Sequence, residues 1–282
     1  MPSLVHKRGS SIILSYQESN LVAVKKIKEY GMKTTKWRGY SELAWTEPII
    51  ASPEEYVEET EQFSKVIKEN SKVEPKTLLH LGCGAGGNDC TFKKHFKVTG
   101  VDISEGMIEI ARNCNPEVLY LYGDMRTIKL GKCFDAVAIP DSIGYMTTVD
   151  DLRSAIITAH NHLKPGGLLL IVDNIAEKFI QNNFVYTGSK GDIEITIFEN
   201  NYIYDPTGTT YEATVIYLIR HKGKLEIHSE CHMIGLFKLN TWLDLLKEAS
   251  LEVKQEKIEN LYDCFILGEG KYSLLMFVCT KP

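Results

Sequence analysis

One glycine-rich segment limits what this chain can fold into more than any other feature. The apolar run 77–81 leads directly into Gly82-Cys-Gly-Ala-Gly86, and Asp102 follows twenty residues after Gly82, at the end of a second apolar run. Glycines lack a Cβ atom, so a tight turn built from them lets the backbone approach a ligand closely. A carboxylate at the end of a neighbouring strand can accept hydrogen bonds from a ribose diol. The pattern therefore predicts a site for a nucleoside cofactor.

The glycine spacing by itself leaves two cofactor classes open. Gly82, Gly84 and Gly87 satisfy the G-x-G-x-x-G pattern of NAD-binding proteins, which is a weak signal without its context. An NAD-dependent oxidoreductase is therefore one interpretation of this segment. Motifs further along the chain are needed to distinguish NAD from another nucleoside cofactor.

The composition is that of an ordinary globular protein. The chain has 282 residues, of which 44% are hydrophobic and 24% charged, enough for a large domain with an accessory part. No segment approaches the roughly 18 apolar residues of a membrane span, and the N-terminus lacks the long apolar core of a secretory signal. We therefore expect a cytoplasmic protein that does not enter a membrane.

Charge and cysteine content argue against further classes. The net charge of -5, without a basic stripe, does not favour binding to nucleic acid. The seven cysteines are an odd number without a C-x-x-C pair, so neither a disulfide framework nor a zinc ribbon is expected. On a strand, His228 and His232 would share one face with Glu230 while Cys231 points away. This segment favours a structural strand over a metal site.

Residues 1–75 are predicted to form a helical N-terminal region that acts as a lid. A periodic segment, Asn20–Tyr30, stops at Gly31. The segment 52–55, Ser-Pro-Glu-Glu, has the cap, first-turn proline and capping-box glutamate of a second helix, which should run to about residue 70. The aromatic-rich linker 37–45 between the two helices is expected to close over a pocket.

The segments 76–182 and 238–282 are predicted to form a cofactor-binding core. Short apolar runs alternate with amphipathic segments there, which is typical of a doubly wound, Rossmann-like parallel sheet with crossover helices. Strands are expected at 77–81, 97–101, 117–121, 134–139, 167–173, 251–258 and 272–279, and helices at 87–95, 104–113, 149–163 and 239–249. The fold class is α/β with seven strands in the main sheet.

The period changes to two between residues 183 and 237. Segments such as 193–198 and 211–219 alternate apolar and polar residues, and turn sequences at 205–208 and 221–224 separate them. We expect an antiparallel β insertion after the fifth strand, placed to cover the substrate. An exposed edge of this insertion could serve as the contact of a homodimer.

Five landmarks in fixed order resemble the class I S-adenosylmethionine-dependent methyltransferases. They are the glycine loop 82–86, Asp102, Gly123-Asp-Met125, the fourth strand 134–141, and the turn Leu163-Lys-Pro-Gly-Gly167. Together they are more specific than any single one. The resemblance runs from about residue 40 to the C-terminus, and it implies S-adenosylmethionine as the cofactor.

The resemblance implies a role for each part of the cofactor site. Asp102 would bind the ribose hydroxyls, Asp124 the adenine amine, Ile103 one adenine face, and the Met125 amide a ring nitrogen. The backbone turn would supply donors for the methionine tail, which Tyr40 would also approach. The implied cofactor-binding residues are Tyr40, His80, Gly82, Cys83, Gly84, Asp102, Ile103, Asp124, Met125 and Pro140.

One residue departs from the family pattern. The family usually places Asp or Glu where this chain has His80, and that acid helps to hold the amino group of the cofactor. A protonated imidazole would repel the ammonium and the sulfonium, so weaker or pH-dependent cofactor binding is expected. This departure keeps a second alternative open, a noncatalytic binding protein built on the methyltransferase fold.

The insertion and its flanking segments narrow the resemblance to small-molecule N-methyltransferases. They are similar to the enzymes that dimethylate amino groups of nucleotide-linked deoxysugars and to the glycine and sarcosine methyltransferase group. The residues expected to orient the acceptor or to take up its proton are Asp141, Tyr145, His232 and Tyr40. The expected partner is a small-molecule acceptor, an amine in particular, methylated by direct displacement.

Overall fold

The computed structural model describes residues 37–259 and 261–282, so the helix expected at 20–30 lies outside the described residues. By their contacts, the residues divide into Met1–Trp37 and Arg38–Pro282. The second of these units contains two β-sheets, one of seven strands and one of four.

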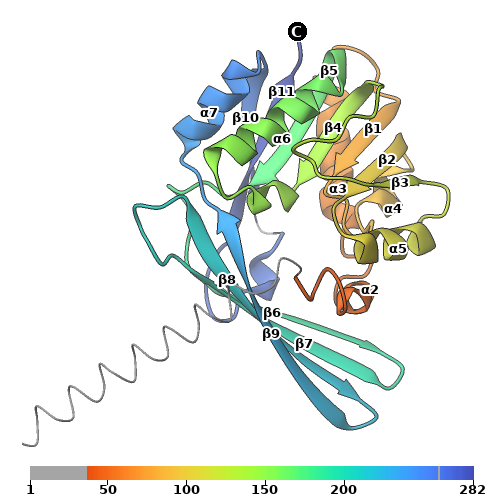
Figure 1. The fold of residues 1–282 in the computed structure, drawn as a ribbon, viewed down its shortest axis with the longest axis vertical. Coiled ribbons are helices and arrows are strands. Elements are labelled where there is room, and N and C mark those ends of the chain that lie inside the picture. Colours follow the sequence, from red (N-terminus) through yellow and green to blue (C-terminus); the bar gives the residue numbers. More distant parts are fainter. Residues whose placement is uncertain (1–36, 260) are drawn as a thin grey trace, which may run out of the picture. The chain divides into compact units, whose positions relative to one another are not determined.

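The larger sheet has the strand order β10-β11-β5-β4-β1-β2-β3 (Figure 1). Its strands are β1 (Thr77–Leu81), β2 (Lys97–Asp102), β3 (Leu119–Tyr122), β4 (Phe134–Pro140), β5 (Leu163–Asp173), β10 (Glu252–Glu259) and β11 (Ser273–Thr280). Neighbouring strands pair in parallel from β3 to β5, and β11 is antiparallel to both β5 and β10. The order reverses between β1 and β4, which is the switch point where doubly wound sheets bind ligands. The predicted fold class is confirmed.

Helices cover both faces of this sheet. They are α3 (Val57–Asn70), α4 (Asp89–Phe92), α5 (Glu105–Cys114), α6 (Val149–Asn161) and α7 (Leu239–Glu248). One buried cluster joins α6 and α7 to the sheet, with Trp242 stacked on Phe277 at a centroid distance of 4.9 Å. A second cluster joins α3, α4 and α5 to the opposite face. Because both faces are covered, the central strands are continuous apolar runs.

The predicted start of α3 was wrong. The helix begins at Val57 rather than at Pro53 after a Ser52 cap, and its N-cap residue, Tyr56, makes no side-chain cap hydrogen bond. The Tyr56 hydroxyl donates to Glu47 at 3.1 Å, and its ring lies 2.5 Å from the position of a Cβ added to Gly87. This packing draws Tyr56 toward the glycine loop, so turns replace the first helical turn that the capping box had predicted.

The smaller sheet forms the predicted insertion. Its strands β6 (Asn183–Lys190), β7 (Ile193–Tyr202), β8 (Thr210–His221) and β9 (Lys224–Gly235) are antiparallel and lie in sequence order. Strand β9 contacts the short helix η2 (Ser142–Tyr145), which directly follows β4. The smaller sheet therefore lies at the carboxyl ends of the parallel strands, as Figure 1 shows.

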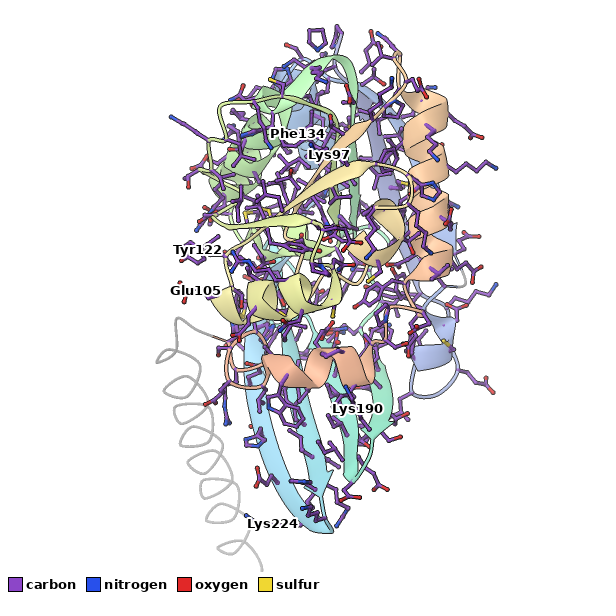
Figure 2. The ribbon with its side chains drawn as sticks, turned by 90° about the vertical axis from the view of Figure 1, so that its right-hand side faces the viewer. Lys97, Glu105, Tyr122, Phe134, Lys190 and Lys224 are labelled. Carbon is purple, nitrogen blue, oxygen red and sulfur yellow. The ribbon has the colours of Figure 1, made fainter. Side chains whose placement is uncertain are left out.

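The segment before α3 lies between the two sheets. It contains η1 (Ala44–Thr46) and α2 (Glu47–Ile50), and α2 lies between the start of α5 at Glu105 and strand β6, which ends at Lys190 (Figure 2). A Cβ added to Gly188 of β6 would be 2.0 Å from the Ile49 carbonyl oxygen, so this close approach needs a glycine. Residues 38–50 thus border the carboxyl ends of the parallel strands.

Candidate active site

Backbone hydrogen bonds within the loop and to β2 hold the glycine loop that follows β1. The amides of Gly82 and Cys83 donate to the Val101 carbonyl at 2.7 and 3.1 Å, and the Gly86 amide donates to the Cys83 carbonyl at 3.0 Å. These three amides are therefore used inside the protein, and the expectation that the turn supplies donors for a ligand tail stays a prediction. A Cβ on Gly82 or Gly86 would meet other residues at 2.1 or 2.7 Å, so the loop offers room for a ligand at a different glycine.

That room is at Gly84, whose backbone is in the left-handed region with φ +52°. Within residues 37–259 and 261–282, no atom outside Gly84 and its two chain neighbours lies within 4 Å of the position that a Cβ on Gly84 would occupy. The Gly84 amide donates to Asp102 Oδ2 at 2.8 Å. The loop therefore presents a bare backbone surface directly beside a carboxylate.

Asp102 ends β2 and is fixed on both oxygens. Besides the Gly84 amide on Oδ2, the Ser104 amide donates to Oδ1 at 2.7 Å. Burial raises the pKa of Asp102, and the two amide hydrogen bonds oppose that rise. A carboxylate has about four lone-pair positions, so two amides leave capacity for a diol. The next residue, Ile103, is 55% exposed and offers an apolar surface beside it.

Asp124 follows β3 and is oriented by an arginine that the sequence analysis did not identify. The Gly123 amide donates to the Asp102 carbonyl at 2.9 Å, which keeps the two strand ends together. Arg126 Nη2 lies 2.6 Å from Asp124 Oδ2, and its Nη1 lies 2.8 Å from Asp151 Oδ1. Hydrogen bonds from Arg126 hold the pKa of Asp124 below its usual range, so Asp124 is ionised at neutral pH.

His80 and Cys83 have buried side chains that support the loop. His80 is 1% exposed, and its Nδ1 lies 2.8 Å from Asp89 Oδ1. The other oxygen of Asp89 accepts from the Tyr120 hydroxyl at 2.9 Å. A positive charge on His80 would therefore be matched inside the protein by Asp89. Burial raises the pKa of the Cys83 thiol well above its usual value, which makes it a poor nucleophile.

Asp141 follows Pro140 at the carboxyl end of β4, in a strained backbone conformation. Its φ of 64° is rare for a residue other than glycine. Asp141 is exposed to solvent. The protein around its carboxyl nevertheless reduces the hydration of the charged form and raises the pKa. Because Pro140 pairs with Val172, Asp141 and Asp173 end neighbouring strands side by side. Asp173 is 3% exposed, and burial followed by the charge of Asp141 raises its pKa well above normal.

Tyr40, Tyr145 and His232 form a continuous hydrogen-bonded chain. The Tyr40 and Tyr145 hydroxyl oxygens are 2.6 Å apart, and the Tyr145 hydroxyl is 2.9 Å from His232 Nδ1. The three come from the turn after Arg38, from η2 and from β9. Burial raises the pKa of both tyrosines far above neutral pH, so their hydroxyls stay protonated. The Ser104 hydroxyl donates to the Tyr40 carbonyl and ties this chain to the end of β2.

The described part of the chain contains neither a candidate metal site nor a helix that could span a membrane. Within residues 37–259 and 261–282, no group of three or more His, Cys, Asp or Glu side chains could hold a metal ion. No helix among those residues is long and apolar enough to cross a membrane. On β9, His228, Glu230 and His232 face inward together, as the alternation predicted.

The fold and this site define a doubly wound α/β protein with a nucleoside-binding edge. The open backbone at Gly84, the Asp102 carboxylate and the exposed Ile103 lie at the ends of β1 and β2, beside Asp124. These groups fit the ribose diol and the adenine ring of an adenosyl group. An adenosyl group carries no pyrophosphate, so such a ligand needs no cluster of phosphate-binding donors.

Comparison with known proteins assigns the family. A model of the methyltransferase domain family matches residues 78–167. The chain is 30% identical over 171 residues to YqeM of Bacillus subtilis, a protein whose name places it among the methyltransferases. The aligned region covers 54% of this chain and 69% of YqeM. It is 28% identical over 190 residues to a Saccharopolyspora spinosa enzyme, dTDP-4-amino-2,3,4,6-tetradeoxy-D-glucose N,N-dimethyltransferase, covering 64% of this chain and 73% of the enzyme.

Solved structures agree on the fold. The sugar N-methyltransferase KedS8 from a Streptoalloteichus species superposes with a TM-score of 0.71 at 20% identity, covering 89% of this chain and 95% of that one. The chain belongs to the class I S-adenosylmethionine-dependent methyltransferases. Its cofactor is S-adenosylmethionine, and the NAD-dependent alternative is set aside.

Proposed function

We propose that this enzyme methylates the nitrogen of a small-molecule amine, with an aminosugar as the first acceptor to test. Two of the relatives described above carry names that state N-methylation of a sugar. The site supports an amine acceptor because a hydrogen-bonded chain of neutral hydroxyls and an imidazole ends at the carboxyl edge of β4. Such a chain can orient an amine and accept its proton.

The residues of this chain have separate tasks in the proposed reaction. S-adenosylmethionine, when bound, supplies an electrophilic methyl group on a sulfonium. Asp102, Asp124 and the open face of Gly84 would hold it. Residues 38–50 would exclude water from the reacting atoms, which favours a displacement in which charge is dispersed. Correct alignment of the amine is the largest contribution expected from the pocket.

A proton must leave the nitrogen for a neutral amine to form. An acceptor that arrives as an ammonium ion loses a proton before it attacks, and a methylated amine loses one afterwards. The Tyr40–Tyr145–His232 chain can carry that proton, one hydrogen moving along each hydrogen bond, so that the imidazole becomes an imidazolium. This chain is the single observation on which the choice of acceptor depends most.

Single-turnover transfer of a labelled methyl group tests the proposal. The acceptors should include a nucleotide-linked aminosugar, the free aminosugar and the matching sugar in which a hydroxyl replaces the amine. We expect label on nitrogen with one of the amines and none on the hydroxyl analogue. Tyr145→Phe, which removes one link of the chain, should slow transfer by roughly tenfold or more. Label on oxygen alone, or no transfer to any amine, would contradict the proposal.

We further propose that the enzyme works in the cytoplasm. All seven cysteines are free thiols, which fits a reducing compartment. A homodimer stays a prediction from the sequence. If it forms, strand β9 at the edge of the smaller sheet is where we expect the contact.

A further inference from the structure

Glu230 is a buried carboxylate that the family resemblance does not explain. It lies two residues before His232 on β9, so both side chains point to the same side of the sheet, and each is 7% exposed. Glu230 Oε1 lies 3.2 Å from His232 Nε2, which is an ion-pair distance but does not have hydrogen-bond geometry. The opposite nitrogen of the ring, Nδ1, is the one that contacts Tyr145.

Three hydrogen-bond donors fix the Glu230 carboxylate. The Gly39 amide and the Tyr217 hydroxyl donate to Oε1 at 3.0 and 2.9 Å, and the Arg38 amide donates to Oε2 at 2.6 Å. Burial raises the pKa of Glu230, but His232 and these donors outweigh it and bring the pKa below its usual value. Glu230 is therefore ionised at neutral pH, and an ionised carboxylate can only accept hydrogen bonds.

This arrangement assigns a direction to the two hydrogen bonds that join Tyr40, Tyr145 and His232. Because an ionised carboxylate lies 3.2 Å from Nε2, its charge favours the neutral His232 tautomer that is protonated at Nε2, and Nδ1 is then the acceptor. Tyr145 then donates its one hydroxyl proton to Nδ1, so Tyr40 must donate to Tyr145. Along these hydrogen bonds, Tyr40 is therefore the residue farthest from His232.

We propose that Glu230 is a positioning residue for methyl transfer: it sets the tautomer of His232 and stabilises the imidazolium that forms when a proton arrives from the acceptor nitrogen. The inference rests on the proposed function. A proton leaves the nitrogen for Tyr40, Tyr40 gives its own to Tyr145, and Tyr145 gives its own to His232 Nδ1, so that no atom or charge is lost.

Groups from several elements face the His232 ring. Tyr40 and Tyr145 contact it with ring centroids 5.7 and 5.9 Å away, and Glu199 on β7 is close enough for His232 to lower its pKa. Burial nevertheless raises the pKa of Glu199 above normal overall. Glu230, whose pKa is lowered, is therefore the carboxylate that carries full charge beside the ring.

The same strand contains a matched control. Glu226 and His228 have the same spacing as Glu230 and His232, but their closest contact is 3.7 Å and Glu226 is 53% exposed. Glu226→Gln removes the same charge from β9 at a solvent-exposed position. It should leave both the chemistry and the titration of His232 unchanged.

The first experiment needs no turnover. In the full chain labelled with ¹⁵N-histidine, the His232 signals are those absent from His232→Asn. We expect the neutral ring to be protonated at Nε2, and its titration midpoint to fall by about one pH unit in Glu230→Gln. An Nδ1-protonated ring, or an unchanged midpoint, would overturn the inference whether or not any amine is methylated. If Glu230→Gln does not fold, Tyr217→Phe takes its place: losing one donor to Glu230 should raise the midpoint by a few tenths of a unit, and a fall would overturn the inference.

The second experiment is a double-mutant cycle on single-turnover rate. Glu230→Gln should lower the rate roughly tenfold and move the acidic limb of the pH–rate profile to lower pH, with little change in cofactor affinity. In the His232→Asn background the same substitution should change the rate less than about twofold. Equal losses in both backgrounds would show that Glu230 acts by holding Arg38 and Gly39 instead, and would overturn the inference.

Discussion

Replacing Gly84 with alanine separates backbone strain from loss of the cofactor site. Gly84 has φ +52°, and an alanine in the left-handed region costs about 1 kcal/mol of folding free energy. Gly131 is a matched control: its φ is +65°, and among the described residues no atom outside Gly131 and its two chain neighbours lies within 4 Å of its Cβ position either. Urea unfolding should show that Gly84→Ala and Gly131→Ala are destabilised by a similar amount.

Cofactor affinity should distinguish the two variants. The methyl group of Gly84→Ala would project into the space beside Asp102 that we assign to the adenosyl group. Forcing a ligand away from one methyl group costs about 2 kcal/mol, which is roughly a 30-fold loss of affinity. Isothermal titration with S-adenosylhomocysteine should show that loss for Gly84→Ala and wild-type affinity for Gly131→Ala. Equal affinity in the two variants would refute the assignment of this space to the cofactor.

Three further predictions concern single side chains. Asp102→Asn places an NH₂ group against the amide of Gly84 or Ser104, so titration should show at least about tenfold weaker binding of S-adenosylhomocysteine; unchanged affinity would exclude Asp102 from the site. Iodoacetamide should modify the exposed Cys114 in the native protein and spare the buried Cys83, and mass spectrometry showing the reverse order would contradict the burial of the loop. Burial raises the pKa of Asp135, but hydrogen bonds, with that from Lys164 the largest, bring it to about 2. The stabilisation is present above the unfolded-state pKa of about 4 and is lost as pH falls toward 2. Because Lys164 is 46% exposed, solvent screens its charge. In chemical denaturation, Asp135→Asn should therefore lower the free energy of unfolding by about 1 kcal/mol at pH 7 and by almost nothing at about pH 2.

The core of the fold could be predicted from the sequence because short, local sequence patterns specify its strands and turns. A buried parallel strand is a continuous apolar run, and a strand exposed on one face alternates, so the seven-stranded sheet and the insertion could both be predicted. Glycines mark the turn after β1 because the conformation at Gly84 is one that side chains rarely adopt. Each of these features lies within a few consecutive residues.

The start of α3 could not be predicted because a distant contact decides it. Ser52 begins a good capping box, but Tyr56 packs against Glu47 and the glycine loop instead of continuing a helix. A similar local signal was reliable at Ser104, whose hydroxyl accepts from the Met107 amide and caps α5. Ser52 has the capping-box residue Glu55, whereas Ser104 has Met107 in that place, so the surroundings and not the stronger local signal decide where each helix begins.

The missed site residues are those whose partners are far away in the chain. Glu230 binds the backbone of Arg38, 192 residues earlier, and no spacing rule connects them. Arg126 is two residues from Asp124, but the carboxylate that completes its pairing, Asp151, comes from α6. Asp173 was within reach of sequence reasoning: it ends an apolar strand in the same way as Asp141 does.

A crystal structure of the protein with S-adenosylhomocysteine tests the central claim most directly. We predict both ribose hydroxyls within hydrogen-bond distance of Asp102, the adenine beside Ile103 and Asp124, and the sulfur on the side of Tyr40 and Tyr145. Ligand density away from Gly84 and Asp102, or a sulfur turned away from the two tyrosines, would contradict this account of the enzyme.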